Sequence, residues 1–208
     1  MSLSSDLTKK DINVEKVTEK ALKDNKALTE LLENILGKKE TLRFNSFKVL
    51  LLISEEHPKV LFPEWDFFAK LLDSDNAYHK YIGIYIIANL TRVDTKNRFE
   101  KMFNHYYGLL DDPRIVPPSH VALNSGKIIR AKPKLETKIT KRLLSIDETH
   151  HETGRKDLIK GYVIEGFNEY FGEAKSQKEI LEFVKRQLKS TSPKTRKVAK
   201  EFLKRWEK

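Results

Sequence analysis

The adjacent histidines His150 and His151 are the first residues of the chain whose types and spacing could do chemistry. Asp147, Glu148 and Glu152 flank them, and imidazole together with carboxylate suits zinc or iron. Side chains of neighbouring residues seldom point at one centre, however, and the stretch is typical of a turn between helices. We therefore predict no metal site and no metal cofactor.

Catalytic motifs give no other starting point. The chain has no glycine-rich phosphate loop, no GxSxG or HExxH motif and no obvious Ser/His/Asp set. It also has no cysteine, which excludes disulfides, thiolate metal sites and a cysteine nucleophile. The sequence predicts that the protein is not an enzyme and carries no cofactor.

Basic residues are the remaining chemical signal. The net charge is +10, but residues 1–125 hold 18 basic and 18 acidic side chains, so the excess lies in the C-terminal half. Residues 126–142 are net +6, residues 143–174 net −4 and residues 175–208 net +8. The chain is therefore a basic protein with two separate basic blocks.

These blocks predict a surface for nucleic acid or for an acidic protein partner, because clustered Lys and Arg release counterions when they bind phosphates. The alternative is a solvated end of the fold, since Lys-rich helix faces are common. The sequence leaves open whether the two blocks share one face. The candidate binding residues are Lys127, Arg130, Lys194, Arg196, Lys197, Lys200, Lys204 and Arg205.

Long helices must position these residues. The chain of 208 residues has only 8 Gly and 7 Pro, too few for a sheet with frequent tight turns. The longest nearly apolar run, residues 81–90, is half of the roughly 20 residues that a membrane-spanning helix needs. No export signal is apparent either, so we expect a cytoplasmic protein without membrane contact.

The apolar residues recur with helical spacing. Trp65, Phe68, Ala69 and Leu72 lie three, four and seven apart, as on one face of a helix. Further stripes predict helices over residues 78–90, 99–110, 121–129, 139–146, 158–171, 180–188 and 198–206. We expect Trp65 and Trp206 to lie in the core.

Helix boundaries are marked by capping residues. Side-chain oxygens stand at the predicted starts in Asp75-Asn76, Asp94-Thr95, Ser176 and Ser190-Thr191-Ser192. The clearest start is Ser192 followed by Pro193, a cap and then a first-turn proline. Several glycines fall inside predicted helices, where we expect them to let neighbouring helices pack closely. These are Gly83, Gly126, Gly161 and Gly166.

A repeat organises the helices. A Leu closes a helix before a polar turn at positions 36, 72, 110, 144 and 188, with intervals of 36, 38, 34 and 44 residues. Each interval is the length of two helices and their turns. Helix pairs that cannot cover their own apolar surface stack on neighbouring pairs to build a core.

The turns carry a second signal. Lys80 and Gly83 stand eight and eleven residues after Leu72, and Arg196 and Ala199 stand at the same offsets after Leu188. This pattern resembles the HEAT-like, or armadillo-type, repeat. The resemblance implies an all-α fold, an α-α superhelix or solenoid of about five antiparallel helix pairs whose second helices line a concave surface.

Two enzyme families with HEAT-like folds match poorly. Deoxyhypusine hydroxylases hold two irons with four His-Glu dipeptides, of which this chain has only His151-Glu152. Alkylpurine DNA glycosylases combine a basic groove with tryptophans and an aspartate, whereas Trp65 and Trp206 stand at opposite ends of the repeat array.

The sequence therefore predicts a polar segment or cap helix over residues 1–20 and a single HEAT-like repeat domain over residues 21–208. We expect a monomeric scaffold that binds another protein, with acidic character matching the basic blocks. The alternative is a nucleic-acid-associated module that uses those blocks.

Overall fold

Helix-forming patterns become helices throughout the described chain. The computed structural model describes residues 3–207, in which most residues are helical and none is in a strand, and this confirms the all-α prediction. Contacts divide the chain into two compact units between Asp94 and Thr95. The single domain predicted for residues 21–208 stays a prediction, and the predicted N-terminal segment contains two short helices.

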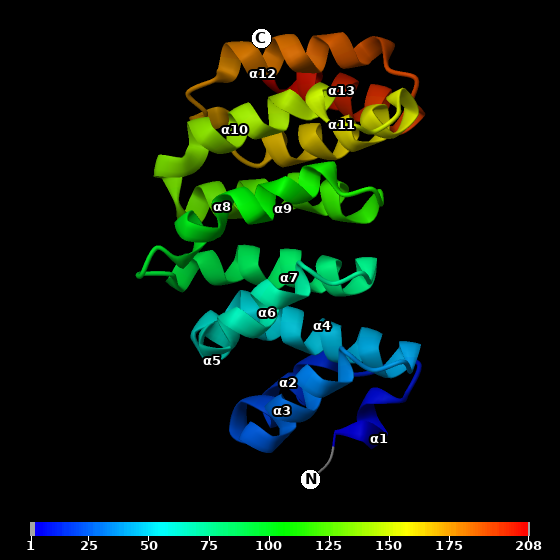
Figure 1. Cartoon of the computed structure of the whole chain (residues 1–208), viewed down its shortest axis with the longest axis vertical. Helices are drawn as coiled ribbons and strands as arrows, with labels where there is room; N and C mark the ends of the chain where they lie inside the picture. The colour runs from blue at the N-terminus through cyan, green and yellow to red at the C-terminus, as the bar shows by residue number, and fades with distance from the viewer. Residues whose placement is uncertain (1–2, 208) are drawn as a thin grey trace. The chain divides into compact units, whose positions relative to one another are not determined.

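Within residues 3–94, the first unit contains seven α-helices, coloured blue to blue-green in Figure 1. They are α1 (Ser4–Leu7), α2 (Val14–Lys23), α3 (Asn25–Asn34), α4 (Glu40–Glu56), α5 (Pro58–Leu61), α6 (Trp65–Leu71) and α7 (Ala77–Leu90). Helix α4 packs against α2, α3 and α7, and α7 packs on α6. The apolar residues Ile53, Phe68 and Ile82 are fully buried in this unit.

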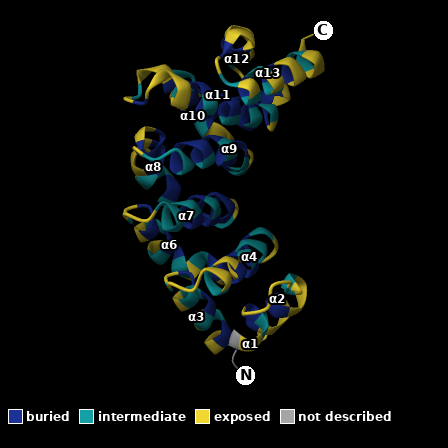
Figure 2. Cartoon of the chain, turned by 90° about the vertical axis from the view of Figure 1, so that its right-hand side faces the viewer, coloured by how far each residue is buried: buried dark blue, intermediate teal, exposed yellow. Residues whose placement is uncertain are grey.

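The second unit holds six α-helices. They are α8 (Arg98–Gly108), α9 (Val116–Ala131), α10 (Glu136–Leu144), α11 (Thr153–Asn168), α12 (Gln177–Arg186) and α13 (Pro193–Trp206). Within this unit, Figure 2 shows α8 and α10 on one side of α9 and α11. Short 3-10 helices follow several α-helices in both units. Those of the described residues are η1 (Phe62–Glu64), η2 (Thr91–Val93), η3 (Leu109–Asp111), η4 (Pro133–Leu135), η5 (Ser145–Glu148), η6 (Phe171–Glu173) and η7 (Gln187–Lys189).

Two helix pairs in the second unit are antiparallel. In the first pair, Lys132 beyond the end of α9 reaches Glu100 at the start of α8, at 2.9 Å, and Tyr107 near the end of α8 donates to Ser125 of α9. In the second pair, Lys156 near the start of α11 donates to the carbonyl of Asp147 beyond the end of α10, at 2.9 Å, and Thr140 of α10 bonds the hydroxyl of Tyr170 beyond the end of α11, at 2.8 Å. Polar contacts thus fix the register of each pair.

Helix starts follow the predicted caps at several places. Asn76 accepts the amide of Tyr78 at the start of α7, and Ser192 accepts the amide of Thr195 ahead of α13, with Pro193 in the first helical position. The start predicted at Asp94-Thr95 was wrong by a few residues. Asn97 takes a left-handed conformation there, with φ 54°, and α8 begins at Arg98.

The two tryptophans occupy different environments. Trp65 is buried, with 2% of its surface exposed. Trp206 is half-buried; its ring packs near Phe171 and Phe202, and its indole N–H donates to Asn168 at 2.7 Å. The core prediction is confirmed for Trp65, whereas Trp206 closes the edge of the core at the end of α13.

Candidate binding surface

Helices α9, α11 and α13 lie side by side in the second unit. His120 faces Tyr162, and ten residues farther along α9 Arg130 pairs with Glu169 of α11, so α9 and α11 run in the same direction. On the other side, the hydroxyl of Thr195 donates to the carbonyl of Asp157, and the end of α13 reaches the end of α11 through Trp206. The three helices therefore form a parallel row.

Glycines let this row pack closely. A Cβ added at Gly161 of α11 would lie 2.7 Å from the hydroxyl oxygen of Thr195 on α13. One added at Gly166 would overlap the carbonyl oxygen of Ala122 on α9, and one added at Gly126 would overlap Glu169. The predicted close packing at these glycines is confirmed, and it also holds at Gly83, which lies against the backbone of α6.

The row presents a continuous stripe of partly exposed side chains. On α9 these include His120, Leu123 and Lys127, on α11 Leu158, Tyr162 and Glu165, and on α13 Lys194 and Val198. The spacing of three, four and seven residues places each group on one face of its helix. The stripe, called here the row face, offers apolar area together with polar groups of both signs.

The centre of the row face is a cluster that joins all three helices. The ring centroids of His120 and Tyr162 are 6.0 Å apart. The ammonium of Lys194 lies 3.2 Å from the centroid of the Tyr162 ring and 3.3 Å from a carboxylate oxygen of Glu165. A cation over an aromatic face is attracted by the electron-rich ring, so Lys194 holds α13 and α11 in register.

This setting changes the acidity of His120. Burial lowers the pKa of its imidazole, and the positive charge of Lys194 lowers it further, to about 4. The ring is therefore neutral near pH 7 and can donate one hydrogen bond and accept another.

The carboxylate of Asp157 anchors the segment before α13 to α11. It accepts the amide and the hydroxyl of Thr191, each at 2.7 Å. Burial raises the pKa of Asp157, but these hydrogen bonds, one from Ser190 and the charge of Lys160 outweigh burial and hold the pKa below its usual value. The start of α13, which carries Lys194, is therefore held in place by a charged buried group.

The candidate cations of α9 differ in their surroundings. Lys127 is half-buried on the row face. Arg130 is exposed, and its guanidinium donates to the carboxylate of Glu169 at 2.9 Å and to the Glu169 carbonyl at 3.2 Å. The carboxylate of Glu169 therefore offsets much of the positive charge of Arg130.

The candidate cations of α13 fall into two groups. Lys194, Arg196 and Arg205 make contacts within the fold: Arg196 donates to the carbonyls of Ser190 and Thr191, and the Arg205 guanidinium lies 4.8 Å from the Trp206 ring centroid. Lys197, Lys200 and Lys204 instead share the exposed face of the helix.

Within the described chain, that exposed face is poorly neutralised. Lys197 lies 4.0 Å from Glu201, and Lys200 and Lys204 form no ion pair with residues 3–207. The two basic blocks are thus split: Lys127 and Lys194 belong to the row face, whereas the lysines at 197, 200 and 204 point away from the row.

The first unit has an aromatic counterpart to the row face. Tyr78, Tyr81 and Tyr85 of α7 are partly exposed, and Phe47 of α4 meets all three rings edge-on. The Arg43 guanidinium lies 4.6 Å from the centroid of Tyr78, and burial raises the pKa of Tyr78 to about 12. This side of α4 and α7 combines the residue types that recur at protein interfaces.

No family model, curated protein or solved structure matches the chain. A proposal about the function therefore has to be argued from the local geometry alone.

The histidine pair is part of a structural turn. His150 contacts Asp111, with 2.6 Å between the ring nitrogen Nδ1 and a carboxylate oxygen, and the ring of His151 hydrogen-bonds the carbonyl of Leu110. Within residues 3–207, no group of three or more His, Asp or Glu side chains is arranged to hold a metal ion. None of the described helices is both long and apolar enough to cross a membrane.

Sequence reasoning missed His120, Tyr162 and Glu165 as site residues. Tyr162 falls within the apolar stripe predicted over residues 158–171, and His120 and Glu165 lie on helices with several other polar residues, so none of the three stands out from the sequence. The signal that could have found them is the helical spacing of Leu158, Tyr162 and Glu165, which marks a second, partly polar stripe on α11.

Proposed function

We propose that the chain is a non-catalytic helical-repeat module that binds another protein through the row face. The observation that carries the proposal is the cluster of His120, Tyr162, Lys194 and Glu165, which joins three parallel helices at a partly exposed surface. A half-buried tyrosine between apolar and charged neighbours has the character of an interface anchor, because its ring offers area and its hydroxyl a hydrogen bond.

We further propose that the helix pairs within each unit are HEAT-like repeats. The close parallel packing of α9, α11 and α13 supports this, since in stacked repeats the second helices lie in one row. The proposed partner is acidic where it meets Lys127 and Lys194. We propose a monomer in the cytoplasm, consistent with the absence of cysteine.

A photo-crosslinking experiment tests the proposal. The full chain would carry p-benzoylphenylalanine at Leu158 on the row face, or at Glu179, which is exposed on α12. After nuclease treatment of a lysate, we expect one defined protein adduct from Leu158 and none from Glu179. Adding Tyr162→Ala to the chain labelled at Leu158 should remove the adduct.

Two results would contradict the proposal. One is labelling of the same proteins from both positions, which means nonspecific contact. The other is recovery of nucleic acid alone before nuclease treatment and of no protein after it.

A second candidate function is nucleic-acid binding by α13. The observation that favours it is the exposed face of Lys197, Lys200 and Lys204, at least two of which have no ion pair within residues 3–207. Three lysines at this spacing could follow a phosphate backbone, and such binding weakens steeply with salt.

Charge reversal separates this candidate from a general effect of net charge. Duplex DNA of arbitrary sequence would be titrated at low and moderate salt with the wild type and with K197E/K200E/K204E. The matched control is K175E/K178E/K189E, which reverses three exposed lysines in the same unit. Nucleic-acid binding by α13 requires loss in the first variant only; equal loss in both would rule it out.

A further inference from the structure

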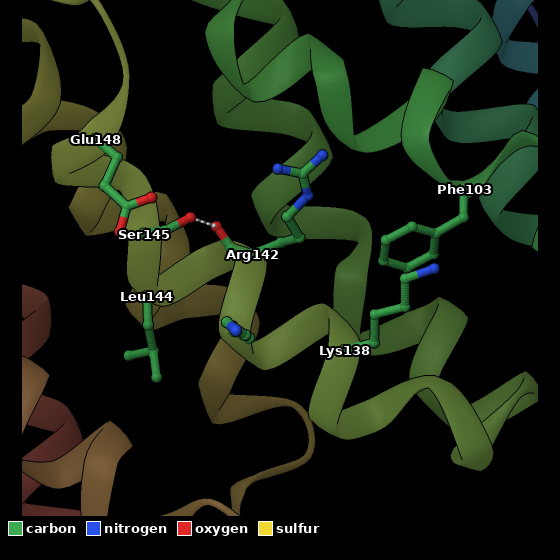
Figure 3. Close-up of a pocket in the computed structure, with 7 residues that line it drawn as sticks. Phe103, Lys138, Arg142, Leu144, Ser145 and Glu148 are labelled. Carbon is green, nitrogen blue, oxygen red and sulfur yellow. Dashed lines mark hydrogen bonds between the residues drawn. The ribbon is translucent and has the colours of Figure 1, made fainter.

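A pocket lies between α8 and α10, away from the row face. Its volume is about 530 Å³, and Figure 3 shows the side chains that line it. Phe103 of α8 and Lys138 of α10 stand at one end, Glu148 of η5 stands at the other, and the guanidinium of Arg142 projects between them. The lining residues are Phe103, Lys138, Lys141, Arg142, Leu144, Ser145 and Glu148.

The positive charges of this pocket are crowded on one helix. Lys138, Lys141 and Arg142 stand at i, i+3 and i+4 on α10, a spacing that brings like charges together on one side of a helix and weakens it. All three side chains are exposed. A bound anion would reduce the repulsion among these three cations.

These cations are not neutralised within residues 3–207. The ammonium of Lys138 lies 3.9 Å from the Phe103 ring centroid, a contact that leaves its charge in place. Lys141 and Arg142 form no ion pair with the described residues, and Arg142 and Glu148 line the same pocket without pairing. Arg142 also lines the smaller neighbouring pocket beside Tyr107, together with Asp111.

We propose that this pocket binds a phosphate monoester carried on a small apolar or aromatic group. Three cations and one carboxylate, that of Glu148, give the lining a net charge of +2, and a phosphate monoester carries about −1.5 to −2 near pH 7. The fork of Arg142 suits two phosphate oxygens, and lysines at its sides act as point charges.

The apolar residues of the lining favour a phosphate that is attached to an apolar group. Phe103 and Leu144 are the apolar residues of the lining. The Phe103 ring is nearly fully buried, with 1% of its surface exposed, and the ammonium of Lys138 covers one of its faces. When Lys138 turns to the phosphate, the face of this ring becomes free for an apolar group. A carboxylate, with a single charge, matches the pocket less well than a phosphate monoester. The site is separate from the row face, so it adds to the proposed function and does not depend on it.

A ligand titration of the full chain tests the proposal. Phenyl phosphate would be added at constant ionic strength while backbone amide and arginine Nε–H signals are followed by NMR. We expect saturable shifts at Arg142 and along residues 138–148. Phenylacetate should bind more weakly than phenyl phosphate, and benzyl alcohol should give no saturable shift.

Variants locate the binding. Arg142→Gln should weaken phenyl phosphate by about tenfold or more, as expected for loss of a charge-assisted pair of hydrogen bonds. Lys141→Gln gives a second variant at an exposed position, with a smaller loss in the same direction. Lys178→Gln removes the same charge from the exposed side of α12 and should change the affinity by less than about twofold, because it leaves the pocket intact.

One further ligand, the capped tripeptide Gly-phosphotyrosine-Gly, distinguishes a phosphorylated protein side chain from a small free phosphate ester. Tighter binding than phenyl phosphate indicates a phosphorylated side chain of a protein, and equal or weaker binding indicates a small free phosphate ester. The proposal is overturned if shifts do not saturate, if inorganic phosphate binds as well as phenyl phosphate, or if Arg142→Gln and Lys178→Gln weaken binding equally.

Discussion

At the scale of single residues, the second unit shows how neighbours decide what a charged or titratable group can do. Arg130, Lys194 and Arg196 are all cations in the sequence, yet each already contacts groups of the fold. In contrast, Lys200 and Lys204 lie on the exposed face of α13 and form no ion pair with residues 3–207. The basic blocks could be predicted from the sequence. Which of their cations form contacts within the fold could not be predicted, because partners such as Glu169 lie 39 residues from Arg130 in the sequence.

The titration of His120 is a prediction at this scale. Its folded-state pKa of about 4 lies below the ordinary value near 6.5. Between these pH values the unfolded chain binds a proton that the folded chain does not, so the free energy of unfolding falls as the pH drops from 6.5 to 4. Because the ring is only half-buried, we expect a loss on the order of 1–2 kcal/mol.

NMR titration of the His120 ring and urea unfolding at several pH values measure this directly. Lys194→Gln should raise the pKa of His120, since it removes a nearby positive charge. His120→Gln should flatten the pH dependence in this range. A pKa of His120 at or above 6.5 in the wild type would show that the ring is neither buried nor close to Lys194.

Asn97 provides a second prediction at the residue scale. Its φ of 54° is left-handed, a conformation that a β-branched side chain resists. Asn97→Val should lower the free energy of unfolding by roughly 1–2 kcal/mol, and Asn97→Gly should be nearly neutral. Urea unfolding of both variants is the measurement, and equal stability of the two would contradict the strained turn before α8.

At the scale of elements, helical spacing predicted the helices well, because each buries an apolar stripe. The caps at Asn76 and Ser192 also indicated where α7 and α13 begin. The start of α8 was misplaced because Asp94 and Thr95 resemble caps, whereas the chain turns at Asn97. Register between helices could not be predicted, since it depends on long-range contacts such as that of Thr195 with Asp157.

The glycine contacts lead to a prediction for the packing of α9 against α11. Gly166→Ala places a methyl group against the carbonyl of Ala122, and forcing the helices apart should cost about 1–3 kcal/mol. Gly154→Ala is the matched control on the same helix, because an added Cβ meets nothing within 4 Å. That variant should gain about 0.5–1 kcal/mol, since alanine restricts the unfolded chain.

Chemical denaturation of the two variants is sufficient to test this packing. The expected result is opposite signs for Gly166→Ala and Gly154→Ala. If both stabilise the protein, α9 and α11 do not approach each other at Gly166.

At the scale of the whole molecule, the chain consists of two compact helical units, each with at least one partly exposed tyrosine on a helix. In the first unit these are the tyrosines of α7 beside Phe47, and in the second Tyr162 lies between α9 and α13. The sequence indicated helix pairs of similar length, but not which polar residues would meet across them. The proposed binding function rests on the parallel row in the second unit.

A nuclear Overhauser measurement on the full chain near pH 7 tests that row most directly. If α9, α11 and α13 form the parallel row, cross-peaks will connect the ring protons of Tyr162 on α11 with the ring of His120 on α9 and with the side-chain methylenes of Lys194 on α13. Cross-peaks to neither residue, in a chain that is otherwise folded and helical, would contradict the parallel row and the binding surface built on it.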